Sequence, residues 1–249
     1  MTRNPRRAQL APAYILHHQP YRDTSRILEA FTREHGRLTV FARGVRGPKG
    51  KLAPLLQPFR LLLLSWSGRG EAPQLIGAEA APRSGELPAG CLMGCFYLNE
   101  LLLKLTTRHD PHASLFDAYH ESLERLRAGA RLEPTLRIFE KRLLQEVGYG
   151  LDLAAEADTG QRIEPQARYQ FRPAQGLVRA SPADAGSLAG SAVLALAAEE
   201  LRGPEELDDA RRLLTAAVAH CLEGRELATR AVARAMARRS FADHSRERR

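Results

Sequence analysis

Alternating apolar and polar positions dominate residues 1–82 and predict β-structure. The segments AYILHH and SRILEAFT are short runs of strand-forming residues, and RLTVFAR alternates strictly along its length. One face of RLTVFAR would carry Leu38, Val40 and Ala42, and the other Arg37, Thr39, Phe41 and Arg43. FRLLLLSW and PQLIGAE flank the glycine-rich SGRGE, as the strands of a hairpin would. Five strands predict a compact barrel. Strand number alone leaves open whether it is an OB-fold, the common nucleic-acid binder, or an SH3-like barrel.

Helical periodicity replaces this pattern from about Pro82 onward. PAGCLMGCFYLNELLLKLTTR is apolar around most of its circumference and predicts a buried central helix. PHASLFDAYHESLERLRAG and EPTLRIFEKRLLQEVGYG predict two more helices, the second with Pro134 in its first turn.

The remainder of the chain predicts an irregular insert and three further helices. Residues 151–180 lose the helical period, and RYQFRPAQGLVRA indicates a small hairpin that turns near Gln175 and Gly176. The later helices are expected at 186–202, 204–223 and 225–239. The predicted fold class is therefore α+β with two domains. A five-stranded OB-fold domain spans 1–82, and a helical domain spans 83–249 with its insert at 151–180.

Positive charge is concentrated in the β-rich part. The whole chain has a formal net charge of +8, yet residues 1–85 hold 14 Lys and Arg against 5 Asp and Glu. Between Glu34 and Glu71 there are seven cations and no acid. A field of one sign attracts polyanions, either nucleic acid or an anionic membrane surface.

The basic segment RLTVFARGVRGPKGKL suggests two kinds of phosphate binding. As a nucleotide-binding P-loop it fails, because five residues separate Gly44 from Gly50 where the motif has four, and Leu52 stands where a Ser or Thr should follow Lys51. As a nucleic-acid surface it combines cations for phosphates with an aromatic ring for base stacking, although Phe41 could instead fill the barrel core. The predicted DNA-binding residues are Arg37, Phe41, Arg43, Arg46, Lys49, Lys51 and Arg69. A second basic row, Arg230, Arg234 and Arg238, is more typical of a solvated helix face.

Residue patterns for metal binding or catalysis are weak. Cys91 and Cys95 lie one helical turn apart with three histidines following, but the short Cys-x-x-Cys pairs of structural zinc sites are missing from the sequence. No local signature places a Ser or Cys nucleophile beside a base. We therefore predict no cofactor, no metal, no catalytic residue and no enzymatic activity. The sparse, odd set of three cysteines suits a cytoplasmic protein, and no segment is apolar enough to predict a membrane span.

Five segments together resemble one known family. They are AYILHHQPYRDTSRILEAFTREHGRLTVFARGVRGPKGKL, LLQPFRLLLLSWSGRGE, YLNELLLKL, LRIFEKRLLQEVGYGLDL and EGRELATRAVARAM. In their order and spacing they resemble RecO, the bacterial recombination mediator, over nearly the whole chain. The resemblance implies an N-terminal OB-fold, a helical C-terminal domain and a non-enzymatic role. Many relatives bind zinc through four cysteines after the GYGLDL segment, and this chain has none there, so it resembles the zinc-free branch.

The resemblance also implies partners and a place of action. It implies binding of single- and double-stranded DNA, annealing of complementary strands, and action with RecR to load RecA onto DNA coated by single-strand-binding protein (SSB), in the cytoplasm at the nucleoid. The acidic, Phe-terminated tail of SSB is expected to dock through Arg137 in the LRIFE segment. A guanidinium suits a terminal carboxylate, although a solvated helix edge is the alternative for Arg137.

Overall fold

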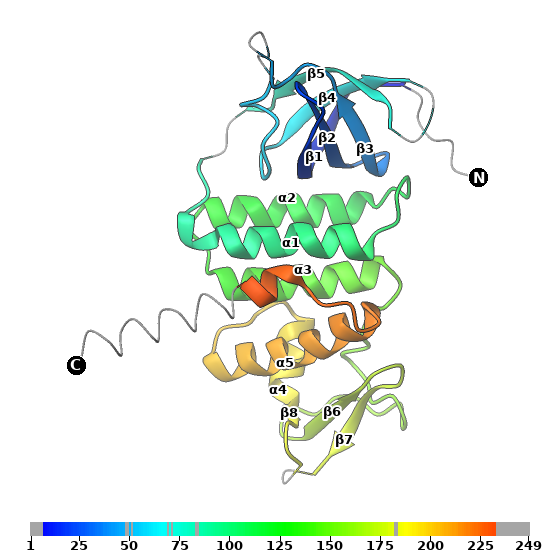
Figure 1. Ribbon diagram of the computed structural model, residues 1–249. Coiled ribbons are helices and arrows are strands. Elements are labelled where there is room, and N and C mark those ends of the chain that lie inside the picture. The colour runs from blue at the N-terminus through cyan, green and yellow to red at the C-terminus, as the bar shows by residue number, and fades with distance from the viewer. Residues whose placement is uncertain are drawn as a thin grey trace, which may run out of the picture. The chain divides into compact units, whose positions relative to one another are not determined.

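The computed structural model describes residues 7–47, 50, 52–68, 70, 72–82, 85–181 and 184–232. The chain forms two compact units, Met1–Ala128 and Gly129–Arg249. The first unit holds a β-barrel and two long helices (Figure 1). Its elements are β1 (Arg7–Tyr21), β2 (Ser25–Thr32), β3 (Gly36–Ala42), β4 (Leu62–Ser67), β5 (Gln74–Ala80), the short 3-10 helix η1 (Ala89–Cys91), α1 (Leu92–Leu105) and α2 (Ala113–Arg127).

The five strands of the first unit close in the order β1-β2-β3-β5-β4. Neighbouring strands are antiparallel except β3 and β5, which pair in parallel where Phe41 meets Gln74. Along β3, buried and partly exposed side chains alternate as the sequence predicted, with Leu38, Val40 and Ala42 inside the barrel. The prediction of a five-stranded OB-fold barrel is confirmed.

Helices α1 and α2 cover part of the barrel's outer surface. Tyr14 on β1 and Phe31 on β2 are fully buried, and each ring lies 5.6 Å from the ring of Phe116 on α2. From α1, the Asn99 side-chain amide donates a 2.8 Å hydrogen bond to the backbone oxygen of Leu16. The two helices thus cover the outer side of β1 and β2 at these residues.

The β2–β3 turn fastens the barrel to the segment between α1 and α2. Gly36 has φ +65°, and a Cβ placed there would lie 2.2 Å from the backbone oxygen of Asp110. The backbone N–H of His109 donates to the oxygen of Arg37 at 2.8 Å. The two helices thus belong to the same compact unit as the barrel. The domain boundary predicted at residue 82 falls in the segment that joins β5 to η1, and it stays a prediction.

The second unit combines helices with a small antiparallel sheet (Figure 1). Its elements are α3 (Leu132–Glu146), β6 (Arg168–Arg172), β7 (Gly176–Ala180), β8 (Leu188–Ala189), α4 (Gly190–Ala197) and α5 (Pro204–Cys221). The predicted hairpin is confirmed as β6 and β7, whose turn is closed by a 3.1 Å hydrogen bond from the N–H of Gln175 to the oxygen of Arg172.

The three helices predicted near the C-terminus agree with the structure to different extents. The helix expected at 186–202 is shorter, because Leu188 and Ala189 pair with β6 as a strand and the helix begins only at Gly190. The helix expected at 204–223 is α5. Residues 228–232 are helical, and the rest of the helix expected at 225–239 lies outside the described residues, as do Arg234 and Arg238.

Candidate nucleic-acid interface

Phe41 lies on the outer face of β3 and outside the barrel core. It is half-buried, and its ring meets the ring of Tyr21 edge to face, with centroids 5.4 Å apart and planes at 90°. Tyr21, at the end of β1, is 38% exposed, and the guanidinium carbon of Arg22 lies 5.4 Å from its ring centroid. An accessible aromatic pair beside a cation can stack a base and hold the neighbouring phosphate.

Two predicted cations, Arg43 and Arg46, follow directly on the loop after β3. Both are exposed, whereas Val45 between them is 4% exposed and packs in the barrel core. The N–H of Arg46 donates to the oxygen of Thr24 at 2.8 Å, which fixes this loop beside the β1–β2 turn. Within the described residues neither Arg43 nor Arg46 has an ion-pair partner. Burial of Val45 therefore anchors the loop, and the guanidinium groups of Arg43 and Arg46 are left free on its outer side.

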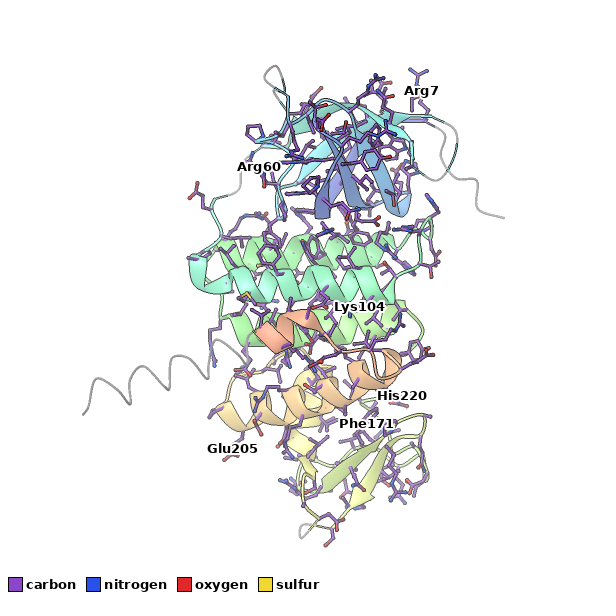
Figure 2. All side chains as sticks on the ribbon, in the orientation of Figure 1. Arg7, Arg60, Lys104, Phe171, Glu205 and His220 are labelled. Carbon is purple, nitrogen blue, oxygen red and sulfur yellow. The ribbon has the colours of Figure 1, made fainter. Side chains whose placement is uncertain are left out.

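A fourth cation reaches the same end of the barrel through β4 and β5. Arg7 pairs with Ser67, Ser67 with Gln74, and Gln74 with Phe41. Three strand spacings, about 15 Å, thus separate Arg7 from Phe41. The side chain of Arg7 extends away from the barrel (Figure 2). We call these exposed cations and the aromatic pair the barrel-end patch: Arg7, Tyr21, Arg22, Phe41, Arg43 and Arg46.

Three predicted DNA-binding residues, Lys49, Lys51 and Arg69, lie outside the described residues. Gly50, which stands between the first two in sequence, is described, and its N–H donates to the oxygen of Gly47 at 2.8 Å. A Cβ at Gly50 would lie 2.2 Å from the oxygen of Val45, so the close approach requires a glycine.

Arg37 differs from the other predicted residues, because its guanidinium already has partners. It donates to Glu29 Oε2 at 3.1 Å, to Thr106 Oγ1 at 3.2 Å and to the Thr106 backbone oxygen at 2.8 Å. Its side chain is only 11% exposed, and this burial lowers the pKa of Arg37. The contacts join β3 to the end of α1 and favour a structural role, while binding of DNA by Arg37 stays a prediction.

Glu29 is the acceptor at the centre of this network. It accepts hydrogen bonds from Thr39 at 2.6 Å and from Arg108 at 2.6 Å, in addition to the one from Arg37. Burial alone would raise the pKa of Glu29, but the hydrogen bonds and positive charges outweigh it and lower the pKa below its ordinary value. The negative charge of Glu29, on β2, is thus compensated by Arg37 and Arg108.

The sequence prediction missed Tyr21, Arg22 and Arg7. A signal for the first two was present, since they stand in HHQPYRDTS, between the first two predicted strands. In OB-folds the loop at this position borders the nucleic-acid face. Arg7 gave no such signal, because only strand pairing across β4 and β5 brings it near Phe41.

The cysteines and histidines that were considered as metal ligands do not come together in a metal site. Cys95 is buried, which raises the pKa of its thiol to about 12, and His120 Nδ1 lies 2.7 Å from the hydroxyl of Tyr14. In the described part of the chain, no three side chains among His, Cys, Asp and Glu are placed to hold a metal ion.

Arg137, the predicted contact for the SSB tail, is buried in α3 rather than on a solvated edge. It is 6% exposed, and its Nη2 donates to Glu140 Oε1 at 2.8 Å. Its Nε has no hydrogen-bond partner. The role of Arg137 toward SSB stays a prediction.

Fold and patch together define an OB-fold protein with a cationic, aromatic surface at one end of its barrel. The family model described as Recombination protein O N terminal matches residues 8–81, and the model described as Recombination protein O C terminal matches residues 91–231. The chain therefore belongs to the RecO family.

Curated relatives cover nearly the whole chain. DNA repair protein RecO of Methylococcus capsulatus is 44% identical over 227 residues, which are 91% of this chain and 93% of that protein. DNA repair protein RecO of Nitrosococcus oceani is 42% identical, over 90% of this chain and 92% of the relative. That of Cupriavidus pinatubonensis is 37% identical, over 92% and 80%. Among the described helices, none has the length and apolar character needed to cross a membrane.

Proposed function

We propose that this chain is a recombination mediator in DNA repair, as its membership of the RecO family and the names of its relatives suggest. It binds single- and double-stranded DNA, anneals complementary strands and, with RecR, helps to load RecA onto SSB-coated DNA. The observation that supports this most is the barrel-end patch, where free guanidinium groups surround an accessible aromatic pair. The mediator acts without catalytic residues or a cofactor, in the cytoplasm at the nucleoid.

The proposed mechanism is electrostatic. Two complementary strands repel each other, and cations that neutralise phosphates on both strands reduce this repulsion. Each neutralised phosphate also releases counterions, so affinity falls as salt rises. With about five phosphates engaged on a single strand, the slope of log K against log salt is near −3.5. The aromatic pair adds stacking with an unpaired base, which favours single-stranded over duplex DNA at this end of the barrel.

Binding to DNA and binding to membranes can be separated directly. We expect the full chain to retain a fluorescent oligo-dT and not to sediment with vesicles of mixed phosphatidylcholine and phosphatidylserine at the same salt concentration. Sedimentation with these vesicles but no retention of DNA would point instead to a module for anionic membranes or other polyanions. Cleavage of the oligonucleotide that EDTA abolishes would argue for an enzyme.

The partner proteins are part of the same proposal. SSB is proposed to dock its acidic tail at Arg137, so Arg137→Ala is expected to weaken binding of an SSB-tail peptide more than binding of DNA. The single substitution also removes the partner of buried Glu140, and breaking such a pair destabilises by about 3–5 kcal/mol. The double variant Arg137→Met with Glu140→Leu keeps the site packed without the guanidinium. Unchanged peptide affinity in this folded double variant would refute the assignment.

A further inference from the structure

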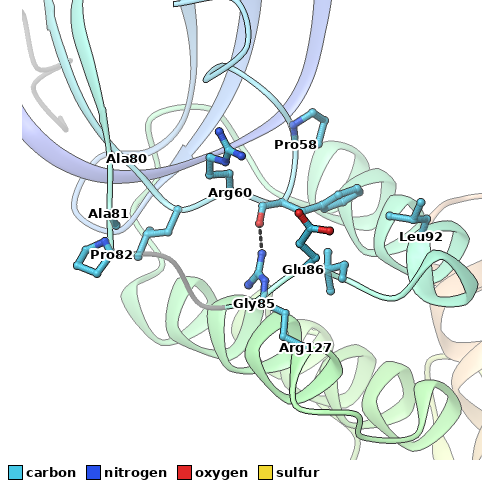
Figure 3. Close-up of a pocket in the computed structure, with 12 residues that line it drawn as sticks. Pro58, Arg60, Ala80, Ala81, Pro82, Gly85, Glu86, Leu92 and Arg127 are labelled. Atoms are coloured by element: carbon cyan, nitrogen blue, oxygen red, sulfur yellow. Dashed lines mark hydrogen bonds between the residues drawn. The ribbon is translucent and has the colours of Figure 1, made fainter.

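A cleft in the first unit lies apart from the barrel-end patch. It has a volume of about 390 Å³ and is lined by residues just before β4, at and after the end of β5, and on helices α1 and α2 (Figure 3). Ala80, at the cleft end of β5, lies about 20 Å along the strand from Gln74, which pairs with Phe41 in the barrel-end patch, at 3.3 Å per residue. The lining residues used below are Phe59, Arg60, Glu86, Leu92 and Arg127.

Large apolar side chains form one wall of this cleft, which Phe59 and Leu92 line. The ring of Phe59 is supported by the ring of Phe96, which it meets edge to face with centroids 4.9 Å apart. Phe96 is 42% exposed and Leu92, one helical turn earlier on α1, is 38% exposed. Large apolar side chains clustered at the surface around a hollow mark a binding site more often than scattered ones do.

Arg127 holds this wall in place. It donates to Glu124 Oε1 at 2.6 Å and to the backbone oxygen of Phe59. Phe59 has φ +66°, in the left-handed region that a bulky residue rarely adopts. Backbone in such a region persists where the surrounding structure fixes it, and it is often found at binding sites. The hydrogen bond from Arg127 therefore fixes the position of Phe59 in the cleft wall.

Charge at the cleft differs from charge at the barrel-end patch. Arg60, just before β4, lines the cleft on its barrel side and has no hydrogen-bond or ion-pair partner within the described residues; Glu86 lines it as well (Figure 3). Arg127 is neutralised by Glu124. The local charges cancel, so a polyanion gains little here, whereas a single carboxylate can pair with Arg60.

We propose that this cleft docks a segment of a partner protein that places one bulky apolar side chain against Phe59 and Leu92 and one carboxylate on Arg60. The apolar wall supplies contact area, and the guanidinium fixes the orientation of the segment. Glu86 can accept a backbone N–H of the same segment. This protein-binding site is separate from the DNA-binding surface and from Arg137.

The chemistry is tested with N-acetyl-L-tryptophan, which carries both groups, and with its primary amide, which lacks the carboxylate. Titrated into the ¹⁵N-labelled full chain, the acid is expected to shift the backbone amide signals of Phe59, Leu61 and Leu92, with a dissociation constant on the order of a millimolar. Arg60→Gln is expected to weaken binding of the acid about tenfold and to leave binding of the amide unchanged.

Three results would overturn the proposal. They are no shift at these amides, equal affinity of acid and amide for the unaltered chain, and the same shifts on addition of oligo-dT, which would make the cleft a DNA subsite. The matched variant Leu92→Ala, which truncates an apolar lining residue, should lose affinity for both probes and keep the DNA affinity of the unaltered chain. Its exposed position makes it compatible with folding.

Discussion

Removing the two free guanidinium groups beside Val45 should change how DNA binding responds to salt. In the double variant Arg43→Ala with Arg46→Ala, the buried Val45 and the backbone hydrogen bond to Thr24 remain, so the loop should keep its place. Each lost phosphate contact removes about 0.7 from the slope for single-stranded DNA, so two contacts take it from near −3.5 to about −2.1. Affinity should fall about 25-fold at 0.1 M salt and about fivefold at 0.3 M.

Fluorescence anisotropy of a labelled oligo-dT, titrated at salt concentrations from about 0.05 to 0.4 M, gives this slope. The matched control is Arg33→Ala with Arg125→Ala, which removes the same net charge from the first unit. Both of these arginines are already in ion pairs, Arg33 with Asp117 at 2.8 Å and Arg125 with Glu121 at 3.7 Å. We expect the control to keep a slope near −3.5.

Two outcomes would refute the reasoning. An unchanged slope in the folded Arg43 and Arg46 variant would remove this loop from the DNA contact. An equal fall in the control would show that total charge, rather than the location of free cations, sets the affinity.

Three further predictions test the stacking role of Phe41, the close packing at Gly36 and the buried carboxylate of Glu29. Phe41→Ala should weaken oligo-dT binding by about 1–3 kcal/mol through lost stacking, whereas Phe96→Ala should not, and anisotropy compares them. Gly36→Ala should lower the free energy of unfolding by roughly 2–4 kcal/mol, because its Cβ would collide with the segment after α1; Gly77→Ala, with open space around it, is the control in urea titrations. The lowered pKa of Glu29 means that its stabilising contribution is complete above the ordinary value of 4.5 and is lost as pH falls through the folded value. Stability of Glu29→Gln should therefore fall less steeply with acid, and an identical pH profile would contradict this.

The barrel could be predicted from sequence because its signals are local. Alternation along RLTVFAR placed Leu38, Val40 and Ala42 inside, and the turn residues around it separated the strands. The same alternation put Phe41 and Arg37 on one face but could not tell them apart. Phe41 remained accessible beside Tyr21, whereas Thr106, distant in sequence, occupies the donors of Arg37.

Other features depended on contacts between distant segments. Leu188 and Ala189 fit a helical pattern but pair with β6, so tertiary pairing overrode the local preference there. The cleft beside Arg60 combines a barrel loop, a connecting segment and two helices, and no stretch of sequence carries its outline. Arg137 was identified by resemblance alone, and its burial against Glu140 could not be read from the LRIFE segment.

The most direct test of the proposed function is annealing of complementary single strands coated with SSB, measured with and without this chain in the presence of EDTA. A fluorescence-quenching pair on the two strands reports duplex formation. We expect the chain to accelerate annealing in EDTA, and the Arg43 and Arg46 variant to accelerate it far less. No acceleration by the folded chain, or acceleration that EDTA abolishes, would contradict the account of an electrostatic mediator that needs no metal.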